Sequence, residues 1–69
     1  MFCSSQLSFK WKDVDGNTFE DEFPVFGKSC EEVNLKVNQE IHRKRQQAEE
    51  YSYRDFECKI GNCTCSSSP

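Results

Sequence analysis

Residues 29–50 are the only stretch of this chain long enough to form a full-length helix. Ser29 and Glu32 have the spacing of a capping box, in which the serine hydroxyl accepts a hydrogen bond from the backbone N–H three residues later. After them, no Pro or Gly occurs before Gly61, and most of the residues are good helix formers. We therefore predict a helix from Ser29 to about Glu50. A stripe of apolar residues at helical spacing marks its buried face: Val33, Val37, Ile41 and Ala48.

This predicted helix is longer than the strands we expect beside it. A helix of about 21 residues spans roughly 32 Å, whereas a strand of about eight residues spans roughly 26 Å. Because the second half of the helix is polar, we expect its C-terminal end to extend beyond the sheet. Leu35 lies opposite the apolar stripe. It is either an ordinary exposed leucine or a contact to a second copy or a partner.

Alternating apolar and polar residues predict three strands, and turn residues separate the first two. We expect a three-residue loop, 15–17, that pairs Lys12 with Glu20, because this register gathers apolar side chains on one face and opposite charges on the other. Pro24 indicates that the second strand is an edge strand or ends early. The predicted strands cover residues 7–14, 18–26 and 54–60.

The order of these elements predicts an α+β fold of the ββαβ type: a three-stranded antiparallel sheet with one long helix packed across one face. We expect a flexible lead-in over residues 1–6, a single domain over residues 7–62 and a Cys/Ser-rich tail over residues 63–69. A chain of 69 residues buries a limited share of its surface. Dimerisation, a metal or a disulfide would each add stability.

The N-terminus has neither the basic region nor the apolar run of a signal peptide, and no window reaches the length of a membrane span. We therefore expect a cytoplasmic protein that does not enter a membrane and whose thiols stay reduced. The net charge of −3 argues against nonspecific nucleic-acid binding.

Three of the five cysteines lie close together in the sequence, at Cys58, Cys63 and Cys65. One interpretation is that no cofactor is bound and all three are free thiols, with Cys58 in the core. A second makes the three cysteines ligands of a tetrahedral zinc site, with Cys3 or Cys30 as the fourth ligand. A third joins Cys58 to Cys65 by a disulfide across a tight turn at residues 61–62.

No catalytic set of residues is recognisable, and we predict that the protein is not an enzyme. His42 is the only histidine and lies in a polar run of the helix. Glu20 and Glu22 lie on the charged face of the predicted hairpin, where salt bridges explain them.

Two charged clusters are candidate contact surfaces. The basic run of the helix includes His42, Arg43 and Arg45, and is either a phosphate or acidic-partner site or a solvated surface. Glu20 and Glu22 belong to the acidic run of the second strand, residues 20–22, which suits a basic partner surface but also serves solubility.

The succession of hairpin, helix and strand over residues 7–26, 29–32 and 54–60 resembles the layout of small phage-encoded host-takeover and anti-defence proteins. The resemblance implies a protein that binds and blocks a host protein, or that antagonises a toxin or nuclease. We predict a non-catalytic protein-binding module, an inhibitor or regulator, with a protein partner or a homodimer contact. The alternatives are a small zinc-binding domain and a weak nucleic-acid binder that uses the basic helix segment. The predicted contact residues are Leu35, Glu20, Glu22, His42, Arg43 and Arg45.

Overall fold

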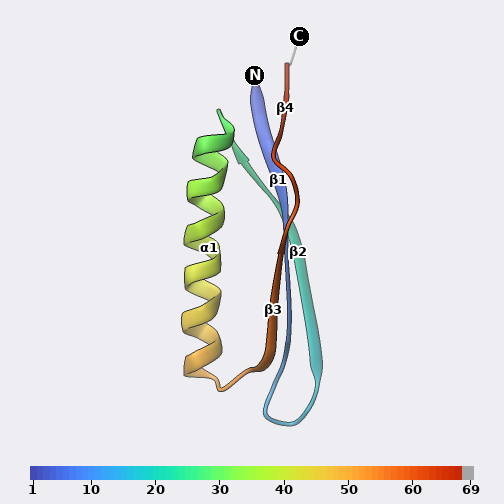
Figure 1. Cartoon of the computed structure of the whole chain (residues 1–69). Helices are drawn as coiled ribbons and strands as arrows, with labels where there is room; N and C mark the ends of the chain where they lie inside the picture. The colour runs from blue at the N-terminus through green and yellow to red at the C-terminus, as the bar shows by residue number, and fades with distance from the viewer. Residues whose placement is uncertain (68–69) are drawn as a thin grey trace.

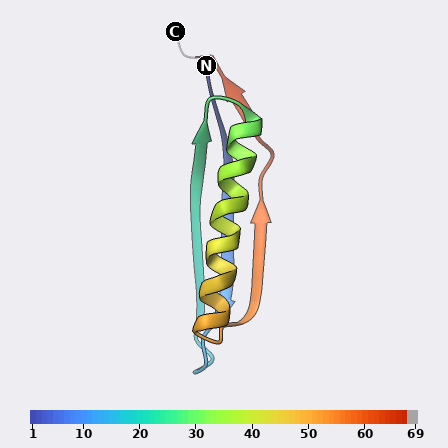
Figure 2. The same cartoon turned by 90° about the vertical axis from the view of Figure 1, so that its left-hand side faces the viewer.

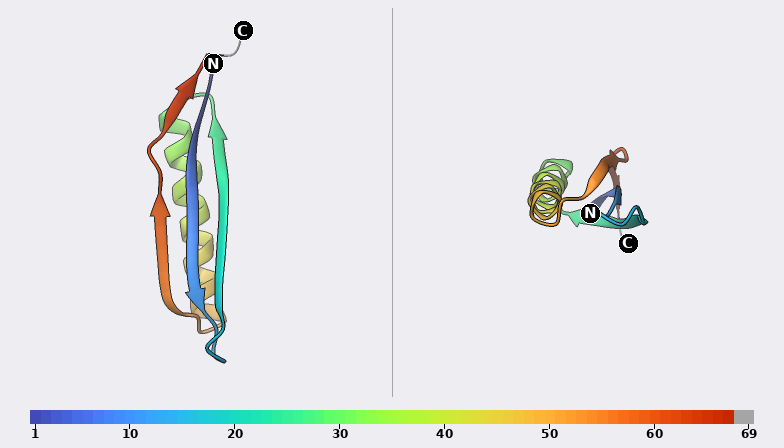
Figure 3. Two further views of the ribbon diagram at one scale, coloured as in Figure 1. Left: turned by 90° about the vertical axis from the view of Figure 1, so that its right-hand side faces the viewer. Right: turned by 90° about the horizontal axis from the view of Figure 1, so that it is seen from below.

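The computed structural model describes residues 1–67, which form one antiparallel sheet and one helix. The chain order is β1 (Phe2–Lys12), β2 (Thr18–Gly27), α1 (Cys30–Glu50), β3 (Arg54–Ile60) and β4 (Thr64–Ser66). Strand β1 is central, with β2 on one side and both β3 and β4 on the other (Figure 1). The helix covers one face of the sheet and leaves the other open (Figure 3).

The predicted α+β class is confirmed, but the prediction of three strands was wrong because β4 is a fourth. Strand β1 begins at Phe2 rather than Leu7, and its first residues pair with β4. Parts of the expected lead-in and of the expected tail are therefore strand. Two residues of that tail, Ser68 and Pro69, lie outside the described residues.

The hairpin between β1 and β2 has a different register from the one we expected. Lys12 lies opposite Thr18, not Glu20, and Lys10 lies opposite Glu20. The loop is shifted by one residue, so that Asp13 and Asn17 close it. The shift preserves which residues share a face, because it moves every pairing by an even number of positions.

The Asp13 side chain explains the observed register. Its carboxylate accepts hydrogen bonds from the backbone N–H groups of Asp15 and Asn17, both at 2.9 Å, and from the Asn17 side chain. Gly16 occupies the left-handed position that this loop requires, with φ of 88°. These local bonds position the turn, and the strand pairing follows from it.

Helix α1 agrees with the prediction at both ends. The Ser29 hydroxyl accepts from the Glu32 N–H at 3.2 Å, while the Glu32 carboxylate accepts from the Lys28 N–H at 2.9 Å. At the other end, Ser52 is left-handed and the Tyr53 N–H bonds the Ala48 carbonyl, as in a Schellman motif. The helix does not overhang the sheet as we expected, because β1 and β2 are 11 and 10 residues long (Figure 2).

The core is a thin layer between α1 and the inner face of the sheet. The molecule measures 48 × 17 × 14 Å, so the buried side chains are spread along its length. Few apolar contacts are left for either end, and each end must be stabilised in another way. The buried apolar residues are Cys3, Leu7, Phe9, Val25, Val33 and Val37.

Candidate functional site

Four of the five cysteines meet at the end of the molecule where the start of β1, β4 and the start of α1 lie (Figure 1). Cys3 is joined to Cys65 and Cys30 to Cys63 as two disulfides. The sulfurs of Cys30 and Cys65, which belong to different disulfides, are only 3.5 Å apart. We call these four residues the cysteine cluster. It connects three segments that are far apart in the sequence: the start of β1, the start of α1 and the segment around β4.

Strand pairing and the helix start bring the cysteine cluster together. Cys3 and Cys65 are direct partners across β1 and β4, with Cα atoms 3.9 Å apart. Two hydrogen bonds hold the turn before β4 over β1: the Gly61 N–H donates to the Gln6 carbonyl, and the Ser5 hydroxyl donates to the Gly61 carbonyl. The second bond also satisfies Ser5, which is buried among apolar residues.

Cys58 is not part of the cluster, which corrects two of our expectations. It lies on β3 opposite Phe9 and is a free cysteine, so the predicted Cys58–Cys65 disulfide was wrong. Of the three predicted zinc ligands, Cys63 and Cys65 are in the cluster, and Cys58 is not. Burial raises the pKa of the Cys58 thiol, which favours its neutral form.

The cysteine cluster has a spacing that suits a metal. The sulfurs of Cys3, Cys30 and Cys65 all lie within 4.8 Å of one another, and no other such group of potential ligands occurs among residues 1–67. Cys30 is the first residue of α1, where the helix dipole stabilises negative charge. The cluster can therefore hold either disulfides or thiolates around a thiophilic cation.

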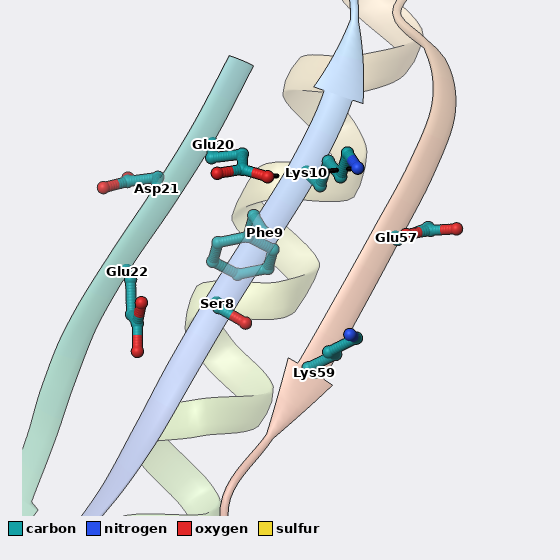
Figure 4. Close-up of a pocket in the computed structure, with 8 residues that line it drawn as sticks. All are labelled: Ser8, Phe9, Lys10, Glu20, Asp21, Glu22, Glu57 and Lys59. Atoms are coloured by element: carbon teal, nitrogen blue, oxygen red, sulfur yellow. Dashed lines mark ion pairs between the residues drawn. The ribbon is translucent and has the colours of Figure 1, made fainter. Parts of the chain in front are cut away.

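A second candidate site is the face of the sheet that α1 does not cover, which we call the open face. A shallow hollow of about 210 Å³ lies on it, and Figure 4 shows its charged side chains. Ser8 lies between Glu22 on β2 and Lys59 on β3, and its small side chain leaves room for the hollow. Beside it, the Lys10 ammonium lies 3.9 Å from the Glu20 carboxylate.

The outer edge of β2 pairs with no other strand among residues 1–67, as Pro24 indicated. In an antiparallel pair, alternate residues point their backbone groups toward the partner strand or away from it. Asp13 and Asn17 form a hydrogen-bonded pair, so the backbone groups of the odd-numbered residues of β2 point toward β1. The backbone groups of the even-numbered residues therefore point outward. Pro24 has no N–H, and the Lys36 ammonium donates to the Phe26 carbonyl. Thr18, Glu20 and Glu22 each direct both a backbone N–H and a carbonyl outward, and we call these three residues the β2 edge.

The predicted contact residues do not form one surface. Leu35 is 60% exposed on the side of α1 that faces away from the sheet. The basic run is exposed on the same helix, and Arg43 pairs there with Glu40 at 3.8 Å. Figure 3 shows that α1 and the open face lie on opposite sides of the molecule. His42, Arg43, Arg45 and Leu35 are thus on one side, and Glu20 and Glu22 on the other.

Sequence reasoning missed a row of stacked rings at the hairpin end of the molecule. The Trp11 ring stacks on the rings of Phe19 and Tyr53, with ring centroids 6.0 Å and 5.6 Å apart. The Tyr53 ring stacks in turn on that of Tyr51, with centroids 5.8 Å apart. We call these four residues the aromatic stack. Their separation in the sequence hides the stack.

Lys44 of α1 closes over the aromatic stack. Its ammonium lies 4.5 Å from the centroid of the Trp11 ring and 3.8 Å from the Asp21 carboxylate. This pair explains why Asp21 sits beside apolar residues on the inner face. The contact also gives the Asp21 carboxylate a positively charged partner from the basic run. An unpaired carboxylate beside apolar side chains would be costly.

No family model matches the chain, and neither the curated proteins nor the solved structures include a detectable match. In the part of the chain that the structure describes, the helix is too polar to cross a membrane.

Proposed function

We propose that this chain is a non-catalytic protein-binding module that acts as an inhibitor or regulator of a partner protein. The observation that carries the proposal is the β2 edge, an uncovered strand edge whose free backbone groups belong to residues next to an acidic surface. An extended segment of a partner can add to such an edge as a further strand. Backbone hydrogen bonds would supply affinity, and the side chains beside them would supply specificity.

The charges beside the β2 edge favour a basic partner segment. Glu20 and Glu22 point their side chains onto the open face at the β2 edge itself. The other charged residues that line the hollow on this face lie farther from that edge, on β1 and β3: Lys10, Glu57 and Lys59. Glu22 and Glu57 have no ion-pair partner among residues 1–67. A partner strand with Lys or Arg at every second residue would place its positive charges on this face, because side chains alternate along a strand.

A second copy of the chain fits the β2 edge less well. Two β2 edges paired antiparallel would bring Glu20 and Glu22 of one copy close to the same residues of the other. Like charges across a strand pair are destabilising. A homodimer through this edge is therefore the alternative outcome of the test and not the proposed one.

The positions of the free cysteine, Cys58, and of the single histidine, His42, support a non-catalytic role. Burial raises the pKa of the Cys58 thiol, and a neutral thiol is a poor nucleophile. His42 is exposed on α1, away from the sheet. Neither residue lies in the hollow on the open face.

The test is a titration of the isotope-labelled protein with a short peptide that alternates valine and lysine. The amide resonances of Thr18, Glu20 and Glu22 are expected to shift most, and the shifts should shrink as salt is added. The matched control peptide alternates valine and glutamate and should leave them unchanged. Shifts spread over α1 with none at the β2 edge would contradict the proposal.

A pair of matched charge variants tests the surface itself. Glu20→Lys/Glu22→Lys should abolish the shifts, whereas Glu49→Lys/Glu50→Lys, which changes the charge equally on exposed residues of α1, should preserve them. Native mass spectrometry of each variant reports the oligomeric state. A wild-type dimer that Glu20→Lys/Glu22→Lys alters would favour the second copy as the occupant.

The second candidate function, zinc binding, is favoured by one specific observation, the spacing of the sulfurs in the cysteine cluster. A cytoplasmic location, which we also propose, would favour the metal state because thiols stay reduced there. Metal analysis of protein purified under reducing conditions tests this candidate. One zinc per chain would support it, and a metal-free protein would exclude it.

A further inference from the structure

The cysteine cluster holds a fourth sulfur beside the three that lie within metal-binding distance of one another. Cys3, Cys30 and Cys65 have sulfurs within 4.8 Å of one another, and the sulfur of Cys63 is bonded to that of Cys30. In a tetrahedral zinc site the Zn–S distance is about 2.3 Å, so its sulfurs are about 3.8 Å apart. The 3.5 Å between Cys30 and Cys65, which belong to different disulfides, is already close to that value.

The backbone around the cluster suits both chemical states. The Cα atoms of Cys30 and Cys63 are 5.8 Å apart, and those of Cys3 and Cys65 are 3.9 Å apart. Side-chain rotation alone changes the distance between two sulfurs by more than an ångström. Disulfides and a metal would therefore connect the same three segments, and the interchange between them needs no change of topology.

Charge and access differ across the cluster in a way that supports such an interchange. Four thiolates around Zn²⁺ carry a net charge of −2, and the N-terminus of α1 at Cys30 partly offsets it. Cys3 is fully buried, whereas Cys65 is exposed. A small oxidant from solvent can therefore reach one sulfur of the site, and the bond to Cys3 then forms inside.

We infer that the cysteine cluster is a single site with two states: a Zn²⁺ tetrathiolate when reduced, and the disulfides Cys3–Cys65 and Cys30–Cys63 when oxidised by a peroxide. This inference rests on the zinc-binding function proposed above and adds its ligand set and its regulation. Four thiolates lose four electrons and form two S–S bonds. Two molecules of hydrogen peroxide accept those electrons and, with four protons, become four molecules of water. The zinc ion leaves with its charge unchanged.

Cys58 provides an internal control for this inference. It is the one cysteine outside the cluster, and it lies beside Phe9 on the inner face of β3. Cys58→Ser should therefore bind zinc and release it like the wild type. Cys63→Ser should lose one ligand and with it stoichiometric zinc binding. Because Cys63→Ser can also fail to fold, the number of sulfur ligands is measured on the wild-type protein.

The experiment begins with full-length protein, reduced without oxygen and titrated with Zn²⁺. X-ray absorption of the zinc form is expected to report four sulfur neighbours at about 2.3 Å. Hydrogen peroxide is then added in the presence of a chromophoric zinc chelator. We expect one zinc released per chain for two peroxides consumed, with loss of four thiols and retention of the fifth. Substitution of Co²⁺ for Zn²⁺ gives an independent optical signal of tetrahedral thiolate coordination.

The possible failures are distinguishable. If the reduced protein takes up no metal, both the zinc-binding function and the two-state site are wrong. If it binds zinc but fewer than four sulfurs coordinate, or if Cys58→Ser abolishes binding, zinc binding stands and the ligand set is wrong. If four sulfurs bind zinc and peroxide does not release it as the two disulfides form, the interchange is overturned.

Discussion

The two ends of this elongated domain are stabilised by different chemistry. At one end, the cysteine cluster connects β1, α1 and β4 covalently. At the other, the aromatic stack and Lys44 connect the hairpin, the end of α1 and the start of β3 without any covalent bond. Both ends adjoin the thin core, since Cys3 is one of its members and Trp11 packs against it. The difference teaches that the covalent links at one end of the fold depend on the redox state of its cysteines, while the contacts at the other end do not.

The largest effect should come from reduction of the cysteine end. The two disulfides close chain separations of 62 and 33 residues, and each contributes about 4 kcal/mol, although the total is smaller because one loop lies inside the other. A domain of this length is typically stable by about 5 kcal/mol. Protein that is reduced and metal-free should therefore be largely unfolded by circular dichroism. A melting temperature that reduction leaves unchanged would contradict this. The control is Cys58→Ser, which keeps both disulfides and should be as stable as the wild type when oxidised.

Trp11→Ala should have the next largest effect, at the opposite end. The half-buried ring contacts Phe19, Tyr53 and Lys44, so its loss should cost about 2–3 kcal/mol and lower Tm by about 10–20 °C. The effect should be local. Amide exchange should accelerate in the hairpin and the last turns of α1, while amides beside Cys3 stay protected. Equal acceleration at both ends would show that the ends are not independent.

Lys44→Met separates the charge of Lys44 from its packing. The substitution keeps an unbranched side chain one atom shorter and removes the charged contacts to Trp11 and Asp21, so we expect a loss of about 1 kcal/mol in chemical denaturation. Lys59→Met, which removes a charge without an ion-pair partner among residues 1–67, should change stability little. A double-mutant cycle with Asp21→Asn would divide the loss between ring and carboxylate. Equal effects of the two lysine substitutions would rule out a specific role for Lys44.

The smallest effect concerns the hairpin loop and pH. Hydrogen bonds, above all from the Asn17 backbone N–H, lower the pKa of Asp13 below its ordinary value. A carboxyl whose pKa is lowered by folding stabilises the protein above its unfolded pKa, and this contribution disappears as the pH falls through the folded pKa. NMR titration of the Asn17 amide should follow that protonation. Asp13→Asn should remove the acidic step, and a step that persists would assign it to another group.

Sequence analysis predicted features of this fold that depend on local chemistry. The capping box at Ser29 defined the start of α1, and Pro24 identified β2 as an edge strand. The hairpin register was wrong because we weighed the opposite charges of Lys12 and Glu20, an exposed pair of small energy. The Asp13 side chain and the left-handed Gly16 determine the loop instead.

Features that depend on distant contacts were missed. Residues 1–6 lack an apolar alternation, so the start of β1 is not visible from its own residues. It becomes a strand because β4 pairs with it and because the Ser5 hydroxyl bonds the Gly61 carbonyl. The two disulfides were missed for the same reason, since Cys3 and Cys30 are close to Cys63 and Cys65 only in the folded chain.

The most direct test of the central claim, that four cysteines form one site and Cys58 stays outside it, is a non-reducing peptide map of the oxidised protein. Free thiols are alkylated first, and trypsin then separates the cysteines, since it cleaves after Lys10, Lys28, Lys36, Arg54 and Lys59. The account predicts one product that links residues 1–10, 29–36 and 60–69 by two disulfides, and an alkylated, unlinked peptide of residues 55–59. A disulfide that includes the peptide 55–59 would contradict it.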